Sequence, residues 1–288
     1  MILDTLVPDS PAAAVANTSK INAELAAMQR GVVRLPAGVF FVAPTTTSAV
    51  CLFLKRSNVS LAGEGRYATT LRLPFDIDAH LINVVNVRGV TVSGLEVDGS
   101  QTPGVPGIGH GIRGENWSDG GIDDVWVHDT PSYGIGCQEG VFDNFHITNF
   151  EVGWTGVDGV DFKDLANANV MTVAHGLIHH WGLATADRKN GLDVRGRATV
   201  YGMRFYGLGN RIALNLRPGA AGATNHRADY SLVDNIRIVG EGVVGSVGVS
   251  AIARQCVINN VQIDGCATGI INPLASGNAA SGIIVRPG

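Results

Sequence analysis

The octet VSGLEVDG at residues 92–99 recurs along the chain and decides its architecture. Each copy reads apolar, polar, turn residue, apolar, any, apolar, any, and usually a turn former. The alternation predicts a strand with one buried face, and the Gly, Asn or Asp before it predicts a bend. The copies start 30, 20, 31, 27, 33 and 25 residues apart. They are IDDVWVHD (122–129), FDNFHITN (142–149), a weaker VAHGLIHH (173–180), VYGMRFYG (200–207), VDNIRIVG (233–240) and INNVQIDG (258–265).

A second short strand pattern follows most of these octets. Irregular repeats of 20 to 30 residues with two or three short strands and no helix between them predict an all-β, right-handed parallel β-helix solenoid. A β-sandwich is the structural alternative, because it also has many short strands. The second pattern reads HGIRGEN (110–116), YGIGCQE (133–139), DGVDFKD (158–164), NGLDVRG (190–196) and, more loosely, RIALNLRP (211–218), VGVSAIAR (247–254), TGIINPL (268–274) and SGIIVRP (281–287).

One helix is predicted, at residues 10–30. Ser10 suits the N-cap, Pro11 the first helical position, and Gly31 the stop. A solenoid exposes the unpaired end of its core, so we expect this helix to cap residues 31–288 within a single domain, 1–288. The sequence still has a strand pattern at its end, GIIVRPG, so we expect that end to be covered by further chain or by a homo-oligomer such as a trimer.

Composition excludes several partner classes. The chain has 288 residues, is 45% hydrophobic, and carries a net charge of −4, which argues against a nucleic-acid partner. It contains no apolar run of 18 or more residues, so no membrane partner is expected, and the start MILDTLVPDS has no signal-peptide pattern. The four cysteines lack metal-site spacing, and we expect free, buried thiols.

The segments GVVRLPAGVFFV (31–42) and NVSLAGEGRYATTLRLP (58–74) resemble the entry coils of pectate-lyase-like right-handed parallel β-helix proteins, including phage tailspike depolymerases. The resemblance covers nearly the whole chain as architecture. It implies a polysaccharide or oligosaccharide ligand, because these proteins mostly lyse, hydrolyse, epimerise or bind polysaccharides. It also implies an extracellular or virion-associated location. Fold alone does not establish function.

The motifs DGVDFKD and NGLDVRG place an acid and a base at matching outward positions. If Val160 and Phe162 face the core, Asp161 and Lys163 face out. Coils stack about 4.8 Å apart, so equivalent residues form columns. The first column is Arg113, Gly136, Asp161, Asp193 and Asn215, and the second is Glu115, Gln138, Lys163, Arg195 and Arg217.

This two-column stripe is our predicted catalytic site, with Asp161, Lys163, Asp193 and Arg195 as its catalytic residues. Stacked carboxylates repel each other unless cations or a shared proton compensate, which suggests a site. The alternative is that the stripe has no catalytic role and is a solvated ladder of charges that discourages aggregation. We expect the substrate to be bound by Arg113, Glu115, Gln138, His179, Trp181, Asn215 and Arg217.

Two chemistries fit the stripe. A lyase acting on an acidic polysaccharide needs a base and a group that neutralises the uronate carboxylate, such as arginine or Ca²⁺ held by Asp158, Asp161 and Asp193. A glycoside hydrolase would use Asp161 and Asp193 as a carboxylate pair. The segment GHG at 109–111 is similar to one in polygalacturonase-like β-helix hydrolases. In those enzymes the segment follows the Asp motif, whereas in this chain it precedes DGVDFKD. We favour the lyase; a non-catalytic glycan-binding or virion structural β-helix remains the other alternative.

Overall fold

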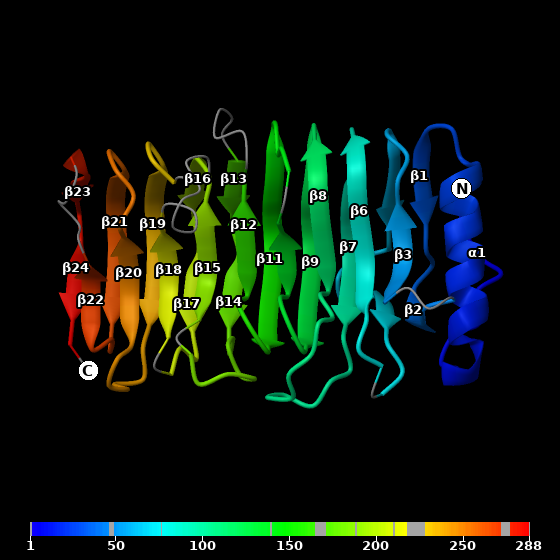
Figure 1. The fold of residues 1–288 in the computed structure, drawn as a ribbon, viewed down its shortest axis with the longest axis horizontal. Coiled ribbons are helices and arrows are strands. Elements are labelled where there is room, and N and C mark those ends of the chain that lie inside the picture. Colours follow the sequence, from blue (N-terminus) through cyan, green and yellow to red (C-terminus); the bar gives the residue numbers. More distant parts are fainter. Residues whose placement is uncertain are drawn as a thin grey trace.

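Two parallel sheets wind the chain into a solenoid, with one helix at one end and the C-terminal strands at the other (Figure 1). This computed structural model describes residues 2–45, 49–75, 77–138, 140–164, 171–187, 189–209, 211–217, 228–271 and 277–287. The predicted all-β, right-handed parallel β-helix with an N-terminal helix is confirmed.

The 9-stranded sheet stacks one short strand from each coil in chain order. Its members are β3 (Val50–Leu54), β6 (His80–Arg88), β8 (Ile112–Ser118), β10 (Ile135–Cys137), β12 (Val160–Lys163), β15 (Asn190–Arg195), β18 (Ile212–Leu216), β20 (Val247–Ala251) and β22 (Thr268–Ile271).

The 15-stranded sheet forms the rest of the wall, and several coils contribute two short strands to it. Its members are β1 (Gly31–Arg34), β2 (Gly38–Phe41), β4 (Val59–Ala62), β5 (Thr69–Arg72), β7 (Thr91–Asp98), β9 (Gly120–Thr130), β11 (Phe145–Thr155), β13 (Met171–Ala174), β14 (Leu177–His179), β16 (Ala198–Tyr201), β17 (Arg204–Tyr206), β19 (Leu232–Val239), β21 (Val257–Asp264), β23 (Ala279–Ser281) and β24 (Ile284–Arg286).

The octet lies in the 15-stranded sheet, and its third residue has a left-handed backbone conformation. The angle φ is 62° at Gly94, 52° at Asp124, 55° at His175 and 54° at Asn235. Gly adopts this conformation freely, and Asn, Asp and His adopt it more readily than other side chains. The turn residue predicted at the third position therefore bends each coil.

One predicted copy, FDNFHITN (142–149), is wrong by five residues. Ile122 pairs with Ile147, so the copy in register is ITNFEVGW (147–154). Asn144 also has a positive φ, 49°, which gives the earlier segment the same appearance in sequence. Two left-handed positions in one coil thus produced the error.

The second strand pattern forms the 9-stranded sheet in the predicted register. Its apolar positions pair in the series Ile112, Ile135, Val160, Leu192, Leu214, Val249 and Ile270. The last predicted copy, SGIIVRP (281–287), is the exception. Its Val285 pairs with Ile263 of β21, so this segment belongs to the 15-stranded sheet.

Glycine before the second strand allows the two sheets to meet closely. A Cβ atom on Gly134 would lie 2.4 Å from Val152 Cγ1, and one on Gly159 would lie 2.6 Å from Ile178 Cγ2. Both neighbours are buried side chains of the opposite sheet. The repeated glycine is therefore a packing requirement of the corner.

The core fills the space between the sheets with aliphatic and aromatic side chains. Val160, Phe162, Leu192 and Val194 are at most 1% exposed, which confirms that they face inward. The four cysteines are free and buried, as predicted. No helix among the described residues is long and apolar enough to cross a membrane.

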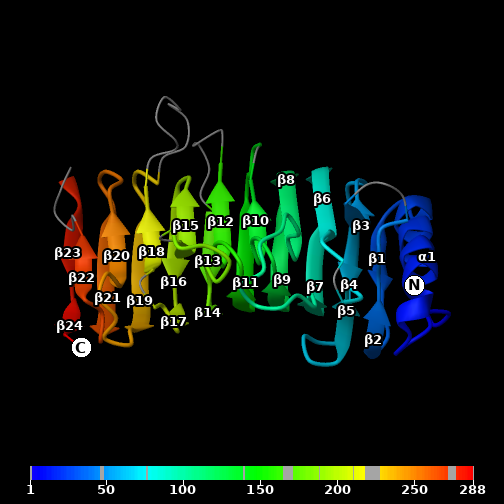
Figure 2. The same cartoon turned by 60° about the horizontal axis from the view of Figure 1, so that its bottom comes forward.

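The N-terminal cap consists of a 3₁₀ turn, Pro11–Ala13, and α1, Ala14–Ala27, so it is shorter than the predicted 10–30 (Figure 2). It lies across the end of the stack and buries Ile21 and Leu25. The Asn22 side chain bonds the open edge of β3. Its Nδ2 donates to Cys51 O at 2.7 Å, and its Oδ1 accepts from Phe53 N at 3.0 Å.

Asn22→Ala is expected to lower the free energy of unfolding by about 1–3 kcal/mol, because it leaves two backbone groups of β3 without these partners. Chemical denaturation measures the loss, with Ser19→Ala on the exposed face of α1 as the control. Equal stability of the two variants would contradict an energetic role for this edge contact.

Candidate active site

The predicted stripe forms on the outer face of the 9-stranded sheet. Asp161 pairs with Asp193, and Lys163 pairs with Arg195. Asp193 in turn pairs with Asn215. The two columns thus lie in the register that the repeated motif predicts.

The two aspartates of the stripe lie beneath its cations. Asp161 is fully buried and receives Lys163 Nζ at 3.0 Å and Arg195 Nη2 at 3.0 Å. Asp193, also fully buried, is contacted by Arg195 Nη2 at 3.0 Å and by Arg217 Nη2 at 2.5 Å. The expectation of outward carboxylates open to a substrate is therefore wrong, because the longer side chains fold over them. The stripe presents cations, with Lys163, Arg195 and Arg217 side chains 22%, 13% and 38% exposed.

The other predicted contacts of the stripe occupy its edges. Gln138 Nε2 donates to Asp161 Oδ2. Arg113 Nη2 lies 3.7 Å from Glu115 Oε2. Asn215 Nδ2 donates to Asn190 Oδ1 at 3.1 Å, while Asn215 Oδ1 has no hydrogen-bond partner among the described residues.

Asp158 is buried and forms a group of three carboxylates with Asp161 and Asp193, whose oxygens lie within 4.8 Å of one another. Burial, and then these two neighbours, raise the pKa of Asp158 to about 7. Ca²⁺ takes six to eight oxygen ligands. The two neighbouring carboxylates already bind Lys163, Arg195 and Arg217, so the donor set does not fit Ca²⁺ in this arrangement.

His110 is the residue of this face that the sequence reasoning did not select. Its imidazole lies over Gly136, where an added Cβ would come within 2.6 Å of His110 Nδ1. Burial, His80, and the cations Arg113 and Lys163 lower the pKa of His110 to about 3. Nδ1 is buried and has no partner among the described residues. A neutral imidazole with an unused nitrogen thus lies beside the cation row.

Tyr133 lies next to His110, with ring centroids 4.9 Å apart. Burial and the charge of Asp161 raise the Tyr133 pKa, while a hydrogen bond with Gln138 opposes them. The phenol therefore stays protonated at neutral pH. The signal for His110 in the sequence was the GHG segment at 109–111, which precedes the Asp motif instead of following it as in the β-helix hydrolases.

His179 and Trp181 do not belong to the stripe, so their prediction as its substrate-binding residues is wrong. His179 is fully buried on β14, in the other sheet, with Nε2 3.2 Å from Glu151 Oε1. Trp181 is fully buried, packs edge-on against Phe205, and donates Nε1 to Lys189 O at 3.3 Å. A buried indole offers no face to a sugar.

A second titratable cluster lies on the outer face of the 15-stranded sheet around His128. Its Nδ1 lies 2.7 Å from Asp129 Oδ2, and its Nε2 lies 3.2 Å from Glu96 Oε1. Burial lowers the His128 pKa, but these two carboxylates and Asp98 outweigh it and raise the pKa to about 9. His128 is therefore charged at neutral pH.

This cluster predicts a pH dependence of stability. Because the folded-state pKa of His128 lies above the unfolded value of 6.5, its contribution is fully present below pH 6.5 and lost as pH rises through about 9. The full contribution is about 3 kcal/mol. Denaturation at several pH values should show wild type losing stability relative to His128→Gln over this window. Parallel pH curves for the two proteins would contradict the charge assignment.

The sequence matches no protein-family model, and comparison with curated proteins also finds no match. Solved structures do match. The N-terminal fragment of bacteriophage Phi29 gene product 12 has a TM-score of 0.60 at 16% identity, covering 99% of this chain and 58% of that one. The catalytic unit of a GH87 alpha-1,3-glucanase from Streptomyces thermodiastaticus has 0.56 at 15%, covering 96% and 59%. Geobacillus virus E2 ORF18 has 0.53 at 12%, covering 93% and 56%.

This chain has the parallel β-helix fold of these proteins. The parallel β-helix fold that the resemblance implies is thereby confirmed. The β-helix spans less than three fifths of the length of each of these three neighbours. At such identities the likeness shows fold alone.

Proposed function

We propose that this β-helix cleaves an acidic polysaccharide by β-elimination on the outer face of the 9-stranded sheet. The observation that carries the proposal is a neutral histidine, His110, next to a row of cations held by buried aspartates. Elimination α to a carboxylate needs both features: charge neutralisation of the carboxylate and a base that is unprotonated at neutral pH.

The cation row is suited to uronate carboxylates. Arg195 lies between Asp161 and Asp193, and its Nε has no partner among the described residues. Arginine binds carboxylates through a planar fork of donors, and the buried acids hold that fork in place. Lys163 and Arg217 extend the positive surface along neighbouring coils. Asp161 and Asp193 are therefore positioning residues in this proposal.

The elimination step uses His110 and Tyr133. With the uronate carboxylate on Arg195 and Lys163, the acidity of the hydrogen on the adjacent ring carbon increases. The His110 imidazole takes that proton, the bond from the β carbon to the glycosidic oxygen breaks, and a ring double bond forms. The Tyr133 hydroxyl donates its proton to the departing oxygen. Binding of the anion offsets the positive charges of Arg113 and Lys163, which lower the His110 pKa in addition to the larger effect of burial.

Hydrolysis is the second candidate, favoured by Asp158. Its pKa of about 7 allows a protonated carboxyl group beside the Asp161 carboxylate, which is the acid and base arrangement of glycoside hydrolases. The structural neighbours include a glucanase and two virus proteins. By analogy, we infer a glycan ligand and an extracellular or virion-associated location.

The test incubates the protein with pectate, alginate and other uronate polymers. Ultraviolet absorbance from an unsaturated product would establish elimination, and new reducing ends without that absorbance would establish hydrolysis. Silence in both assays on every polymer would contradict cleavage and favour a glycan-binding or virion structural β-helix. A chelator should leave the rate unchanged, because the cluster of Asp158, Asp161 and Asp193 does not fit Ca²⁺.

A further inference from the structure

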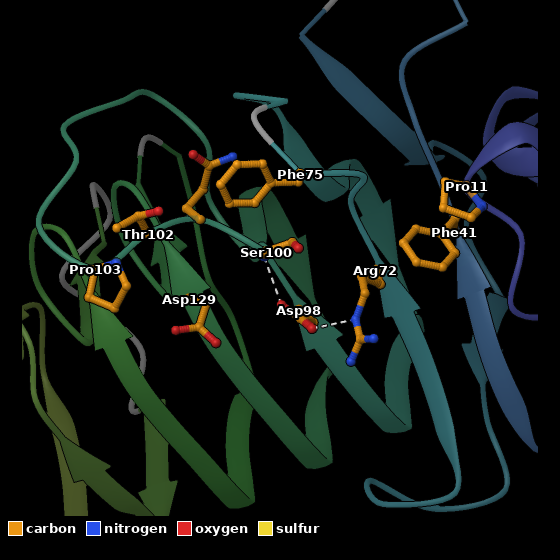
Figure 3. A pocket seen from close by; sticks show the side chains of 10 residues that line it. Pro11, Phe41, Arg72, Phe75, Asp98, Ser100, Thr102, Pro103 and Asp129 are labelled. Carbon is orange, nitrogen blue, oxygen red and sulfur yellow. Dashed lines mark hydrogen bonds and ion pairs between the residues drawn. The ribbon is translucent and has the colours of Figure 1, made fainter.

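A groove of about 610 Å³ lies on the other side of the molecule, beside the ends of β2, β5, β7 and β9. Figure 3 shows Arg72, Asp98 and Asp129 between Phe41 on one side and Thr102 and Pro103 on the other. The volume lies within the range of small-molecule sites in proteins. None of its lining residues belongs to the predicted stripe, so it is a separate site.

Aromatic side chains form the apolar part of this groove. Phe75 is 66% exposed, an unusual state for a phenylalanine, and it lines the groove with Phe41. The guanidinium of Arg72 lies 6.0 Å from the Phe41 ring centroid. Exposed aromatic rings beside polar groups offer a flat apolar surface to the C–H face of a ligand.

Two carboxylates form the polar part, and both are held in fixed orientations. Asp98 accepts from Arg72 Nε at 2.5 Å and from Ser100 N at 2.7 Å. Asp129 lies 2.7 Å from His128 Nδ1, and its side chain is 30% exposed. A carboxylate can accept about four hydrogen bonds, so both groups retain capacity for hydroxyl donors.

We propose that this groove binds a sugar unit that carries no negative charge, as a second glycan site of the protein. Phe75 stacks on the C–H face of the ring, and Asp98 and Asp129 accept from its hydroxyl groups. The charged residues that line the groove are one cation, Arg72, and two carboxylates, Asp98 and Asp129, so the lining carries a net negative charge that disfavours a uronate. The 9-stranded sheet presents Lys163 and Arg195 instead. The two faces therefore select sugars of different charge.

Isothermal calorimetry tests the proposal with cellohexaose, laminarihexaose, maltohexaose, chitohexaose and hexagalacturonate, chosen as neutral and anionic probes of similar length. We expect at least one neutral hexamer to bind wild type, and Phe75→Ala to weaken that binding about tenfold or more. Tyr230→Ala, which removes another aromatic that is 60% exposed, is the control and should bind as wild type does. Failure of all four neutral hexamers to bind overturns the proposal, as does binding that Phe75→Ala leaves unchanged.

The proposed preference of the groove for an uncharged sugar is tested separately with Asp129→Asn, which keeps the shape of the side chain. We expect weaker binding of the neutral hexamer and a smaller difference between neutral and anionic probes. Tm measurements confirm that the variant is folded. Binding of hexagalacturonate that Phe75→Ala abolishes would place an anion in the groove and overturn the charge assignment. Cleavage of uronate polymers should be equal in wild type and Phe75→Ala, so failure of this proposal is distinguishable from failure of the proposed function.

Discussion

His110→Ala is expected to lower kcat on a uronate polymer by about 10²- to 10⁴-fold, the usual contribution of a positioned base. The imidazole is neutral because burial and nearby cations depress its pKa to about 3. Consequently, kcat/KM, which reports the free enzyme, should show no decline attributable to His110 as pH falls through 6.5. Absorbance assays on purified variants measure both effects.

The matched control is His146→Ala. His146 is half-buried on the outer face of the 15-stranded sheet, and burial lowers its pKa as well. Its removal should leave the rate unchanged. Gly136→Ala provides an independent check, since the new methyl group would displace the His110 ring without deleting it. Wild-type rates in both His110→Ala and Gly136→Ala would remove His110 from the mechanism.

Arg195→Ala is expected to reduce the free energy of unfolding by about 3–5 kcal/mol and to abolish turnover. The change removes one partner from two fully buried carboxylates, and breaking a buried ion pair on one side leaves charge without compensation. Urea denaturation measures the loss. Arg286→Ala is the control, because the exposed Arg286 pair with Asp264 should contribute no more than about 1 kcal/mol.

Replacing both partners of the Asp161–Arg195 ion pair separates the effect on stability from the effect on activity. The double variant Asp161→Asn with Arg195→Met should recover part of the lost stability, because it removes the acid together with its partner. It should remain inactive, since no guanidinium remains to bind the uronate. A stable Arg195→Ala protein with normal activity would contradict both roles of this residue.

The register of the stripe was predictable because Asp161 and Asp193 sit in nearly identical motifs, and strand alternation fixes their side. Their burial was not predictable. It depends on how the long side chains of Lys163 and Arg195 fold back over the carboxylates. Strand alternation predicts the face on which a side chain lies, but not whether neighbouring side chains bury it. The position of the two columns was therefore predicted correctly. The prediction that a ligand would meet the carboxylates was wrong, because the exposed groups are the cations.

His110 shows a second limit of sequence reasoning. The GHG segment was noticed, but its order relative to DGVDFKD spoke against a shared site. In a solenoid, adjacent coils bring together residues that precede and follow a motif equally well. The placement of His179 and Trp181 in the stripe was wrong for the opposite reason. They follow the acid motif closely in sequence, but the intervening bend places them on the other sheet or in the core.

The Asn22 amide also bears on how molecules of this protein meet each other. It occupies the hydrogen-bonding edge of β3 where another parallel strand would dock. An uncovered edge of a stack is a template that can recruit a second chain and propagate into a filament. By filling that position with a side chain, α1 blocks the hydrogen-bonding groups of β3 that a strand of a second molecule would otherwise pair with.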